Sequence, residues 1–250
     1  MLKMTTAIFI PARMSSVRLP GKPLAEIDGK PMIVHVWERA VRSGIGPVYV
    51  ASGDEEILSV VQAAGGDVVA TDQEMPSGSD RIYQALLKVD PDGRFDKIVN
   101  LQGDLPDIDP EVISKVLIPL NSPDIDIGTL VSHLDNNDAD NPSNVKVACV
   151  FTPGSLYTRA LYFSRQPIPW GEGDRWHHIG IYSYKRESLH RFVTYPQTLL
   201  ERREKLEQLR ALEAGLRIGC SSVVTPPFSI DTPEDLKLIQ KLMAKKAEQV

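Results

Sequence analysis

The chain has 250 residues, enough for one large domain with a sizeable core or for one domain with an elaborated half. Its 28 basic and 33 acidic residues give a net charge of −5, which excludes a protein that holds DNA or RNA chiefly by neutralising phosphates. Apolar residues at 42% and charged residues at 24% exclude a disordered chain and a fibre.

Strands and helices alternate in the first half of the chain. Nearly all-apolar runs predict buried strands at 7–10, 48–51, 68–70 and 97–101. Helices are predicted between them, from Pro31 to Gly44, from the N-cap Asp54 to Ala64, and around Ile82, Leu86 and Leu87. This order predicts a parallel sheet covered on both faces.

The pattern changes after residue 125. Short, partly alternating runs with turn residues between them predict an antiparallel insertion or subdomain, with strands at 127–131, 145–151, 161–163 and 179–184. We expect no helix before Arg186, and then a long helix from about Thr198 to Ala214. A strand over 218–224 and a helix opened by Pro233 complete the chain.

Two features bear on location. Cys149 and Cys220 are the only cysteines, too few for a disulfide framework and in keeping with a reducing compartment. The first apolar run stops at Pro11, far short of a signal peptide's apolar region, and no later run reaches membrane-spanning length. We therefore expect a cytoplasmic protein that does not enter a membrane.

The loop over 11–23 follows the first strand, at the sheet edge where α/β proteins bind ligands. It gathers three cations, Arg13, Arg18 and Lys22, in an otherwise acidic protein, beside residues whose N–H groups can turn toward an anion. One interpretation is a cradle for a polyphosphate; the other is a solvated loop that happens to be basic. It is not a P-loop, because Pro23 follows the lysine, and no dinucleotide fingerprint follows any strand.

Two aspartates are candidates for a metal site. Asp104 follows the strand at 97–101 and the small residue Gly103, a good position for a ligand-binding acid. Asp231 stands before a helix start, with Thr232 as the expected N-cap. In that position a carboxylate more often serves the helix terminus, so its type and place alone favour the structural role.

Several stretches resemble the 3-deoxy-manno-octulosonate (Kdo) cytidylyltransferase family of Gram-negative bacteria. They follow the family's order almost from end to end and lie at 10–24, 29–36, 77–81, 100–106, 144–147, 160–165, 168–170, 178–182, 204–210 and 230–236. The resemblance implies a three-layer, doubly wound, mostly parallel α/β sheet of the nucleotide-diphospho-sugar transferase type, with a smaller strand-rich subdomain. It also implies CMP transfer from CTP to Kdo, with Mg²⁺, for lipopolysaccharide synthesis.

Residue roles follow from the same resemblance. Asp104 and Asp231 would hold Mg²⁺, and Arg13 and Lys22 would stabilise charge during catalysis. The residues expected to bind the nucleotide are Pro11, Ala12, Arg13, Arg18, Lys22, Ser77, Gly78, Ser79, Arg81, Gln102 and Asp104. Those expected to bind the sugar acid are Gln102, Arg165, His178, Tyr182, Glu207 and Gln208. One nucleotidyltransferase domain is expected, with a nucleotide-binding core at 1–124 and 217–250 and a sugar-binding, dimer-forming section at 125–216.

Residue type alone favours ordinary roles for part of the sugar set. A histidine in a strand such as His178 is usually a hydrogen-bonded structural residue, and Glu207 has Arg203 and Arg210 at salt-bridge spacing on a helix. The physical reason to assign Arg165 to the sugar's carboxylate is its bidentate fork.

Three departures from the family pattern leave the sugar open: Leu105, Ser79 and the short segment between Trp170 and His178. The alternatives are the 8-amino analogue of Kdo, another acidic sugar such as a sialic acid, and a non-catalytic nucleotide-binding protein. The partners expected are CTP, an acidic sugar and a second copy of the chain, with no nucleic acid.

Overall fold

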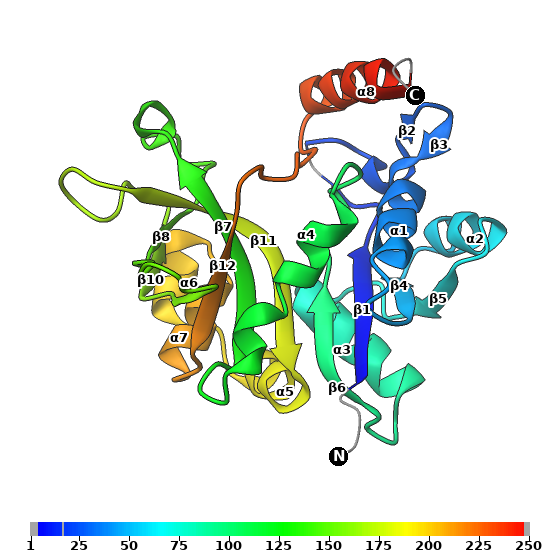
Figure 1. Cartoon of the computed structure of the whole chain (residues 1–250). Coiled ribbons are helices and arrows are strands. Elements are labelled where there is room, and N and C mark those ends of the chain that lie inside the picture. Colours follow the sequence, from blue (N-terminus) through cyan, green and yellow to red (C-terminus); the bar gives the residue numbers. More distant parts are fainter. Residues whose placement is uncertain (1–4, 17, 248–250) are drawn as a thin grey trace. The chain divides into compact units, whose positions relative to one another are not determined.

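The structure is a computed structural model that describes residues 5–16 and 18–247, with side chains through residue 242. It contains two compact units. The first comprises the described residues up to Asp96, then Asn100–Ile113, and those from Pro227 onward; the second comprises Lys97–Val99 and Ser114–Pro226. Figure 1 traces the elements of each unit.

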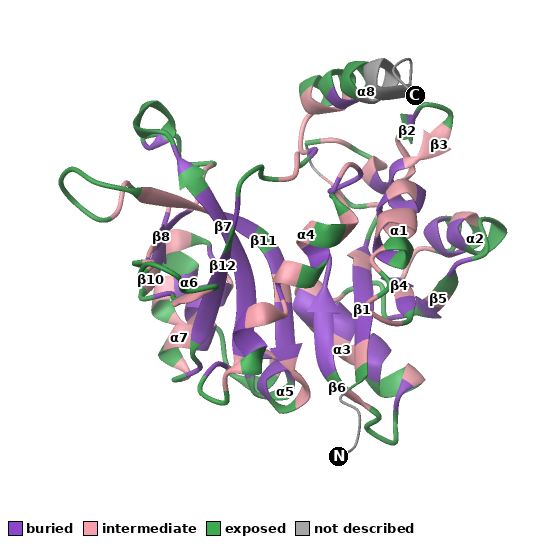
Figure 2. Cartoon of the chain, in the orientation of Figure 1, coloured by how far each residue is buried: buried purple, intermediate pink, exposed green. Residues whose placement is uncertain are grey.

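Parallel strands form the centre of the first unit. β4 (Val48–Ser52) lies between β1 (Thr5–Ala12) and β5 (Asp67–Ala70) and pairs in parallel with both. β6 (Phe95–Asn100) starts in this unit, and its residues 97–99 belong to the second. The side chains of Ala7–Ile10 are all 0% exposed, so both faces of β1 are covered, as the apolar run predicts (Figure 2).

The predicted helices of the first unit are confirmed: α1 (Met32–Arg42), α2 (Glu55–Ala63), α3 (Gly78–Val89) and α8 (Pro233–Ala247). The sequence did not predict the short helices η1 (Lys22–Leu24) and α4 (Pro110–Lys115), or the hairpin of β2 (Glu26–Ile27) and β3 (Lys30–Pro31). α8 packs on the hairpin and on α1 through a buried cluster of Ile27, Met32, Ile230 and Ile239. That cluster fixes the segment leading into α8.

β7 (Ile127–Leu134) is central to the second unit. It pairs antiparallel with β11 (Arg175–Lys185) and parallel with β12 (Ile218–Val223). β12 also pairs with β9 (Thr158–Arg159), and β8 (Lys146–Ala148) pairs with β11 and with β10 (Tyr162–Ser164). The strand-rich section is therefore present, but its sheet is mixed.

The division of the chain differs from the expected 1–124 and 217–250 against 125–216. Residues 114–124, which include η2 (Ile118–Asn121), lie in the second unit, and so does β12. The reason is pairing: β12 forms six residue pairs with β7, from Ile218 opposite Ile127 to Val223 opposite Ser132. Apolar periodicity identifies a strand without identifying its neighbour.

The prediction of one long helix from Thr198 to Ala214 is wrong. After α5 (Arg186–Thr194), the chain forms two short helices, α6 (Leu199–Glu204) and α7 (Gln208–Glu213). Lys205 ends α6 with φ of 55°, in the left-handed region that a helix cannot continue through. Thr198 does begin α6, in a capping box with Glu201.

A short 3₁₀ turn, η3 (Asn136–Asp138), follows β7. None of the helices described between residues 5 and 247 combines the length and apolar character needed to cross a membrane.

Candidate nucleotide-binding site

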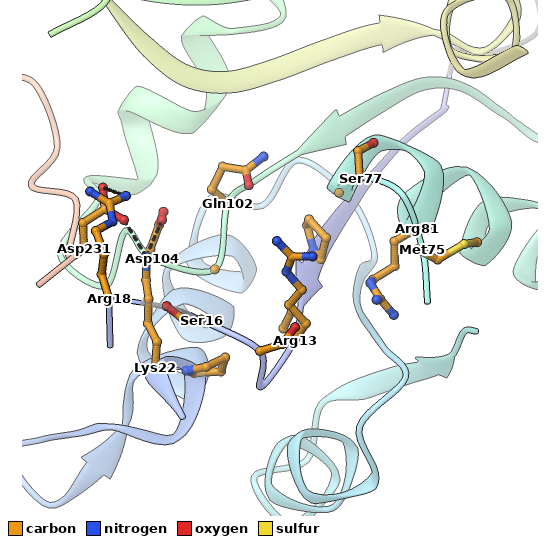
Figure 3. Close-up of a pocket in the computed structure, with 16 residues that line it drawn as sticks. Arg13, Ser16, Arg18, Lys22, Met75, Ser77, Arg81, Gln102, Asp104 and Asp231 are labelled. Atoms are coloured by element: carbon orange, nitrogen blue, oxygen red, sulfur yellow. Dashed lines mark hydrogen bonds and ion pairs between the residues drawn. The ribbon is translucent and has the colours of Figure 1, made fainter. Parts of the chain in front are cut away.

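A cavity of about 380 Å³ lies in the first unit, among the loops that follow β1 and β6 and the start of α3 (Figure 3). It is lined by Pro11, Ala12, Arg13, Ser15, Ser16, Arg18, Lys22, Pro23, Met75, Ser77, Gly78, Arg81, Gln102, Gly103, Asp104 and Asp231. The residues expected to bind nucleotide or metal make up most of this lining; the lining residues that were not predicted are Ser15, Ser16, Pro23, Met75 and Gly103. Ser79 is absent from the described lining and is only 2% exposed.

The loop after β1 is folded around one peptide group. The carbonyl of Met14 accepts the N–H of Ser16 at 2.8 Å and the N–H of Gly21 at 3.4 Å. Gly21 has φ of +68°, a conformation that other residues rarely adopt, and η1 starts directly after it. This turn fixes the backbone from which Lys22 reaches the cavity.

Lys22 bridges the two candidate metal carboxylates. Its Nζ lies 2.8 Å from Asp104 Oδ2 and 3.1 Å from Asp231 Oδ1, and Arg18 Nη2 lies 3.1 Å from Asp231 Oδ2. The Lys22 side chain is only 13% exposed, so this cation is much less solvated than an ordinary surface lysine. The two acids thus converge on one positive charge, at the side of the cavity opposite Ser77 and Arg81 (Figure 3).

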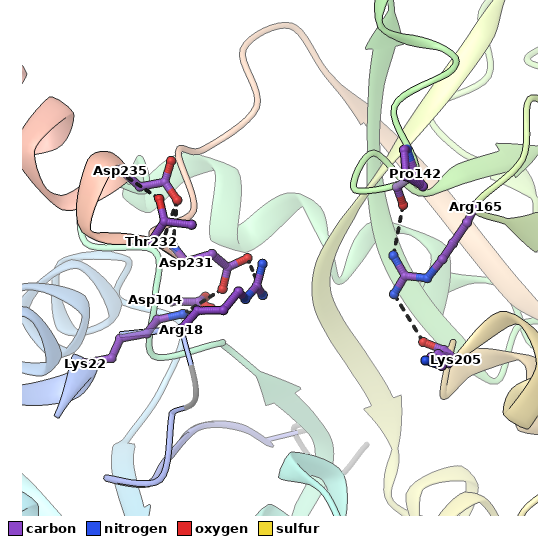
Figure 4. Close-up of polar contacts among 9 residues, drawn as sticks. All are labelled: Arg18, Lys22, Asp104, Pro142, Arg165, Lys205, Asp231, Thr232 and Asp235. Carbon is purple, nitrogen blue, oxygen red and sulfur yellow. Dashed lines mark hydrogen bonds and ion pairs between the residues drawn. The ribbon is translucent and has the colours of Figure 1, made fainter. Parts of the chain in front are cut away.

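One backbone contact brings these acids together from positions far apart in sequence, and local hydrogen bonds then leave the Asp231 carboxylate free of the helix start. The carbonyl of Asp104 accepts the N–H of Ile230, which holds the segment before α8 against the loop after β6. Asp235 Oδ2 then accepts the N–H groups of Asp231 and Thr232, and Thr232 Oγ1 accepts that of Asp235 (Figure 4). Thr232 is therefore the N-cap, as expected, and Asp235 takes the helix-terminus role. The Asp231 carboxylate is left to face Lys22 and Arg18.

Arg81 lies at the cavity with its guanidinium already engaged. It donates to Thr71 Oγ1 at 2.6 Å, to the carbonyl of Asp72 at 3.0 Å and to that of Gln73 at 3.1 Å, and it is 3% exposed. Burial lowers its pKa from the ordinary value. The contacts indicate that Arg81 holds the loop after β5, whereas the exposed Arg13 has its side chain directed into the cavity (Figure 3).

In the second unit, His178 and Tyr182 lie together on β11, with ring centroids 5.4 Å apart. His178 Nε2 lies 3.0 Å from Thr129 Oγ1, whose own proton faces the carbonyls of Ile179 and Ile181 at 3.2 and 2.9 Å. Nε2 is therefore the donor in this hydrogen bond. Burial, helped by the charge of His177, lowers the pKa of His178 to about 3.

This pKa predicts acid sensitivity of the fold. Between pH 6.5 and 3 the unfolded chain binds a proton at His178 that the folded chain does not, so stability falls as the pH drops through that range. From pH 7.5 to pH 5 we expect the wild type to lose about 2 kcal/mol more unfolding free energy than His178→Gln. Urea unfolding of both proteins at the two pH values measures this, and equal losses would contradict the prediction.

The other sugar-site candidates of the second unit lie around the break between α6 and α7. Arg165 donates to the carbonyl of Glu204 at 2.9 Å. It also donates to the carbonyls of Pro142 at 2.9 Å and Lys205 at 3.4 Å (Figure 4). Its fork is thus largely engaged by main-chain oxygens. Gln102, the remaining candidate, belongs to the first unit and lines its cavity.

Glu207 and Gln208 are placed by the same break. Glu207 is the half-buried N-cap residue of α7, and its charge raises the pKa of Tyr182 after the larger effects of burial and of Tyr184. Gln208 is 5% exposed, and its Nε2 is buried with no hydrogen-bond partner among the described residues. The spacing of Glu207 and Arg210 suggested a salt bridge between them on one helix. Arg210 instead forms a bidentate pair with Glu201, at 2.6 and 2.9 Å.

The fold and the cationic cavity are those of a nucleotidyltransferase. The chain aligns over 97% of its length with a solved structure of CMP:2-keto-3-deoxy-manno-octonic acid synthetase complexed with CTP, covering 99% of that chain, at 39% identity and a TM-score of 0.88. The 4-diphosphocytidyl-2C-methyl-D-erythritol synthase of Anaerococcus prevotii shares the fold, with a TM-score of 0.64 at 10% identity over 96% of this chain and 99% of that one. A family model described as cytidylyltransferase matches residues 7–218.

Curated relatives define the family more closely. The 3-deoxy-manno-octulosonate cytidylyltransferase of Paramagnetospirillum magneticum is 53% identical over 97% of this chain and 99% of its own length. That of Methylobacterium radiotolerans is 54% identical over 94% and 96%. The chain belongs to the 3-deoxy-manno-octulosonate cytidylyltransferase family, as the sequence motifs predicted.

Proposed function

We propose that this chain transfers CMP from CTP to the anomeric 2-hydroxyl of Kdo, giving CMP-Kdo and pyrophosphate. The observation that carries the proposal is the arrangement of Arg13, Arg18 and Lys22 in one cavity with two convergent carboxylates, Asp104 and Asp231. Transfer of a nucleotidyl group requires cations that neutralise the departing pyrophosphate. It also requires that the α-phosphorus be made electrophilic, which a metal ion held by carboxylates would do. Membership of the family supplies the identity of both substrates.

In the proposed reaction the sugar hydroxyl attacks the α-phosphorus of CTP in line. The new bond from the hydroxyl oxygen to phosphorus forms as the bond to the β-phosphate oxygen breaks, and the hydroxyl proton is released. Arg13 and Lys22 bind the β- and γ-phosphates and stabilise the charge that pyrophosphate carries away, with Arg18 beside them. The reaction needs no covalent enzyme intermediate.

We also propose that Asp104 and Asp231 hold Mg²⁺. Their donor set fits, because carboxylate oxygens from both residues lie within 3.1 Å of a common cation, the Lys22 ammonium. Among the described residues no cluster of three or more acidic, histidine or cysteine ligands occurs, so phosphate oxygens and water would complete the shell, as is usual for Mg²⁺. When bound, the ion would polarise the α-phosphate.

The proposed contacts of the sugar acid in the second unit are Arg165, His178, Tyr182, Glu207 and Gln208. The buried Nε2 of Gln208 supports this role, since a sugar hydroxyl would satisfy a donor that otherwise costs free energy. The Nδ1 atom of neutral His178 is an acceptor, which suits a hydroxyl better than a carboxylate.

One assay tests the proposed function against its alternatives. The protein is incubated with each nucleoside triphosphate, Mg²⁺, and either Kdo, its 8-amino analogue or sialic acid, and pyrophosphate is measured. We expect release with CTP and Kdo. Release with the 8-amino sugar or sialic acid instead would change the substrate, while no release with CTP and either octulosonate would refute the proposal and favour a non-catalytic nucleotide-binding protein.

We further propose a cytoplasmic homodimer. Both cysteines are buried free thiols, which suits a reducing compartment. Large apolar side chains are exposed in the section 125–216, where the contact between two copies was expected: Val150, Leu156, Leu161 and Trp170. Sedimentation should give twice the mass of one chain, and a monomer at micromolar concentration would contradict the dimer.

A further inference from the structure

Asp54 stands at the N-cap position of α2 but does not cap that helix. Its backbone is extended, with φ of −99° and ψ of 115°, as an N-cap requires, yet its side chain makes no hydrogen bond to the first turn. Instead its Oδ2 accepts the N–H of Met14 at 2.8 Å, from a residue 40 positions earlier. The carboxylate therefore serves the loop after β1.

Asp54 joins three loops of the first unit. It follows β4, its Oδ2 binds the loop after β1, and its Oδ1 lies 3.5 Å from Nε2 of Gln73, which follows β5. Its own N–H donates to Ser52 Oγ at 3.1 Å, which ties Asp54 to the end of β4. The turn is also pressed against the next loop, because a Cβ at Gly53 would lie 2.5 Å from the Cα of Gln73.

Met14, the residue that Asp54 holds, is also the acceptor around which the loop over residues 11–23 folds. Met14 lies between Arg13 and Ser15, which both line the cavity, and its carbonyl accepts the N–H groups of Ser16 and Gly21. Asp54 is therefore the anchor on the other side of the same residue. Without it, the N–H of Met14 loses a charged acceptor and the backbone of Arg13 and Ser15 loses a restraint.

We propose that Asp54 is a positioning residue for the nucleotide: its carboxylate holds Met14 and thereby sets the conformation in which Arg13 and Ser15 meet the phosphates. This inference rests on the proposed function. It differs from the roles of the lining residues, because Asp54 is not part of the cavity lining and would act through the loop.

Two measurements test it on Asp54→Ala, Asp54→Asn and the matched control Glu55→Ala, an exposed acid one residue later. The first is hydrogen exchange of the Met14 amide without nucleotide, and the second is the Kd for CTP by calorimetry. In Asp54→Ala we expect faster exchange and a Kd raised about tenfold. Asparagine keeps an oxygen acceptor, so the Kd of Asp54→Asn should stay within about threefold of the wild-type value. Glu55→Ala should have the exchange rate and the Kd of the wild type.

Unchanged exchange or an unchanged Kd in Asp54→Ala would overturn the proposal, as would equal losses in Glu55→Ala. If the alanine variant does not fold, Asp54→Ser replaces it. Serine keeps an oxygen that can cap α2, but its side chain is too short to reach Met14, so we expect the faster exchange and the raised Kd of Asp54→Ala. A wild-type chain that binds no CTP would contradict the proposed function, whereas unchanged Met14 exchange in Asp54→Ala would contradict the anchoring role of Asp54. Exchange at Met14 separates the two failures, because it requires no nucleotide.

Discussion

Replacing Asp231 by asparagine is expected to lower the rate of pyrophosphate release by about a hundredfold or more. The substitution keeps the size of the side chain but removes one of the two negative charges that converge on Lys22. A site with Asp104 as its single carboxylate would hold Mg²⁺ more weakly, so the Mg²⁺ concentration for half-maximal rate should also rise.

The fold should survive this change. The contacts that begin α8 use the backbone N–H of Asp231 and the side chains of Thr232 and Asp235, and none of them uses the Asp231 carboxylate. That carboxylate is 41% exposed, so its loss should change the free energy of unfolding by no more than about 1 kcal/mol. Urea unfolding of Asp231→Asn checks this.

Asp235→Asn is the matched control. It alters an acid of the same segment that serves the helix terminus, so we expect some loss of stability with turnover largely retained. Near-normal pyrophosphate release by Asp231→Asn would exclude its carboxylate from the metal site. Equal loss of activity in the two variants would instead assign the effect to the position of the whole segment.

The sequence predicts this site better than it predicts the elements around it. The strand at 7–10, the cationic loop and Asp104 after its glycine are local features, and local composition is enough to find them. The bridge from Lys22 to Asp231 depends on the contact between Asp104 and Ile230, which no spacing reveals. The motif resemblance supplied Asp231 where position alone favoured a structural role.

The break at Lys205 shows why apolar periodicity failed over 198–214. Leucines recur at helical spacing, and neither glycine nor proline marks a stop. The break is stabilised by contacts from outside the segment: Arg165 binds the carbonyls of Glu204 and Lys205, which the end of α6 leaves free. Tertiary hydrogen bonds thus overrode the local pattern.

The reach of Asp54 was hidden for a similar reason. An aspartate before a helix is correctly predicted as its N-cap residue, and the backbone takes that conformation. Its side chain can nevertheless serve a more distant donor, because the loops after β1 and β4 emerge at the same edge of the parallel sheet. Position in sequence fixes the backbone role, and packing decides the partner of the side chain.

Lys22→Met is expected to lower kcat/KM for CTP by about a hundredfold to a thousandfold. The substitution retains most of the apolar stem and removes a positive charge that is shielded from solvent, at 13% exposure, where it would meet the phosphates. Lys22→Arg should recover part of the loss. An arginine keeps the charge, but its planar fork does not reproduce a point charge between two carboxylates.

Lys22→Met should also bind Mg²⁺ more tightly than the wild type in the absence of CTP. In the wild type the Lys22 ammonium lies between Asp104 and Asp231, at 2.8 and 3.1 Å, and so would compete with a metal ion for their oxygens. Removing it leaves two facing carboxylates that a dication would neutralise. Calorimetric titration of Mg²⁺ into the wild type and Lys22→Met measures this directly. Weaker nucleotide turnover together with unchanged or weaker Mg²⁺ binding would show that Lys22 and the ion do not share these oxygens.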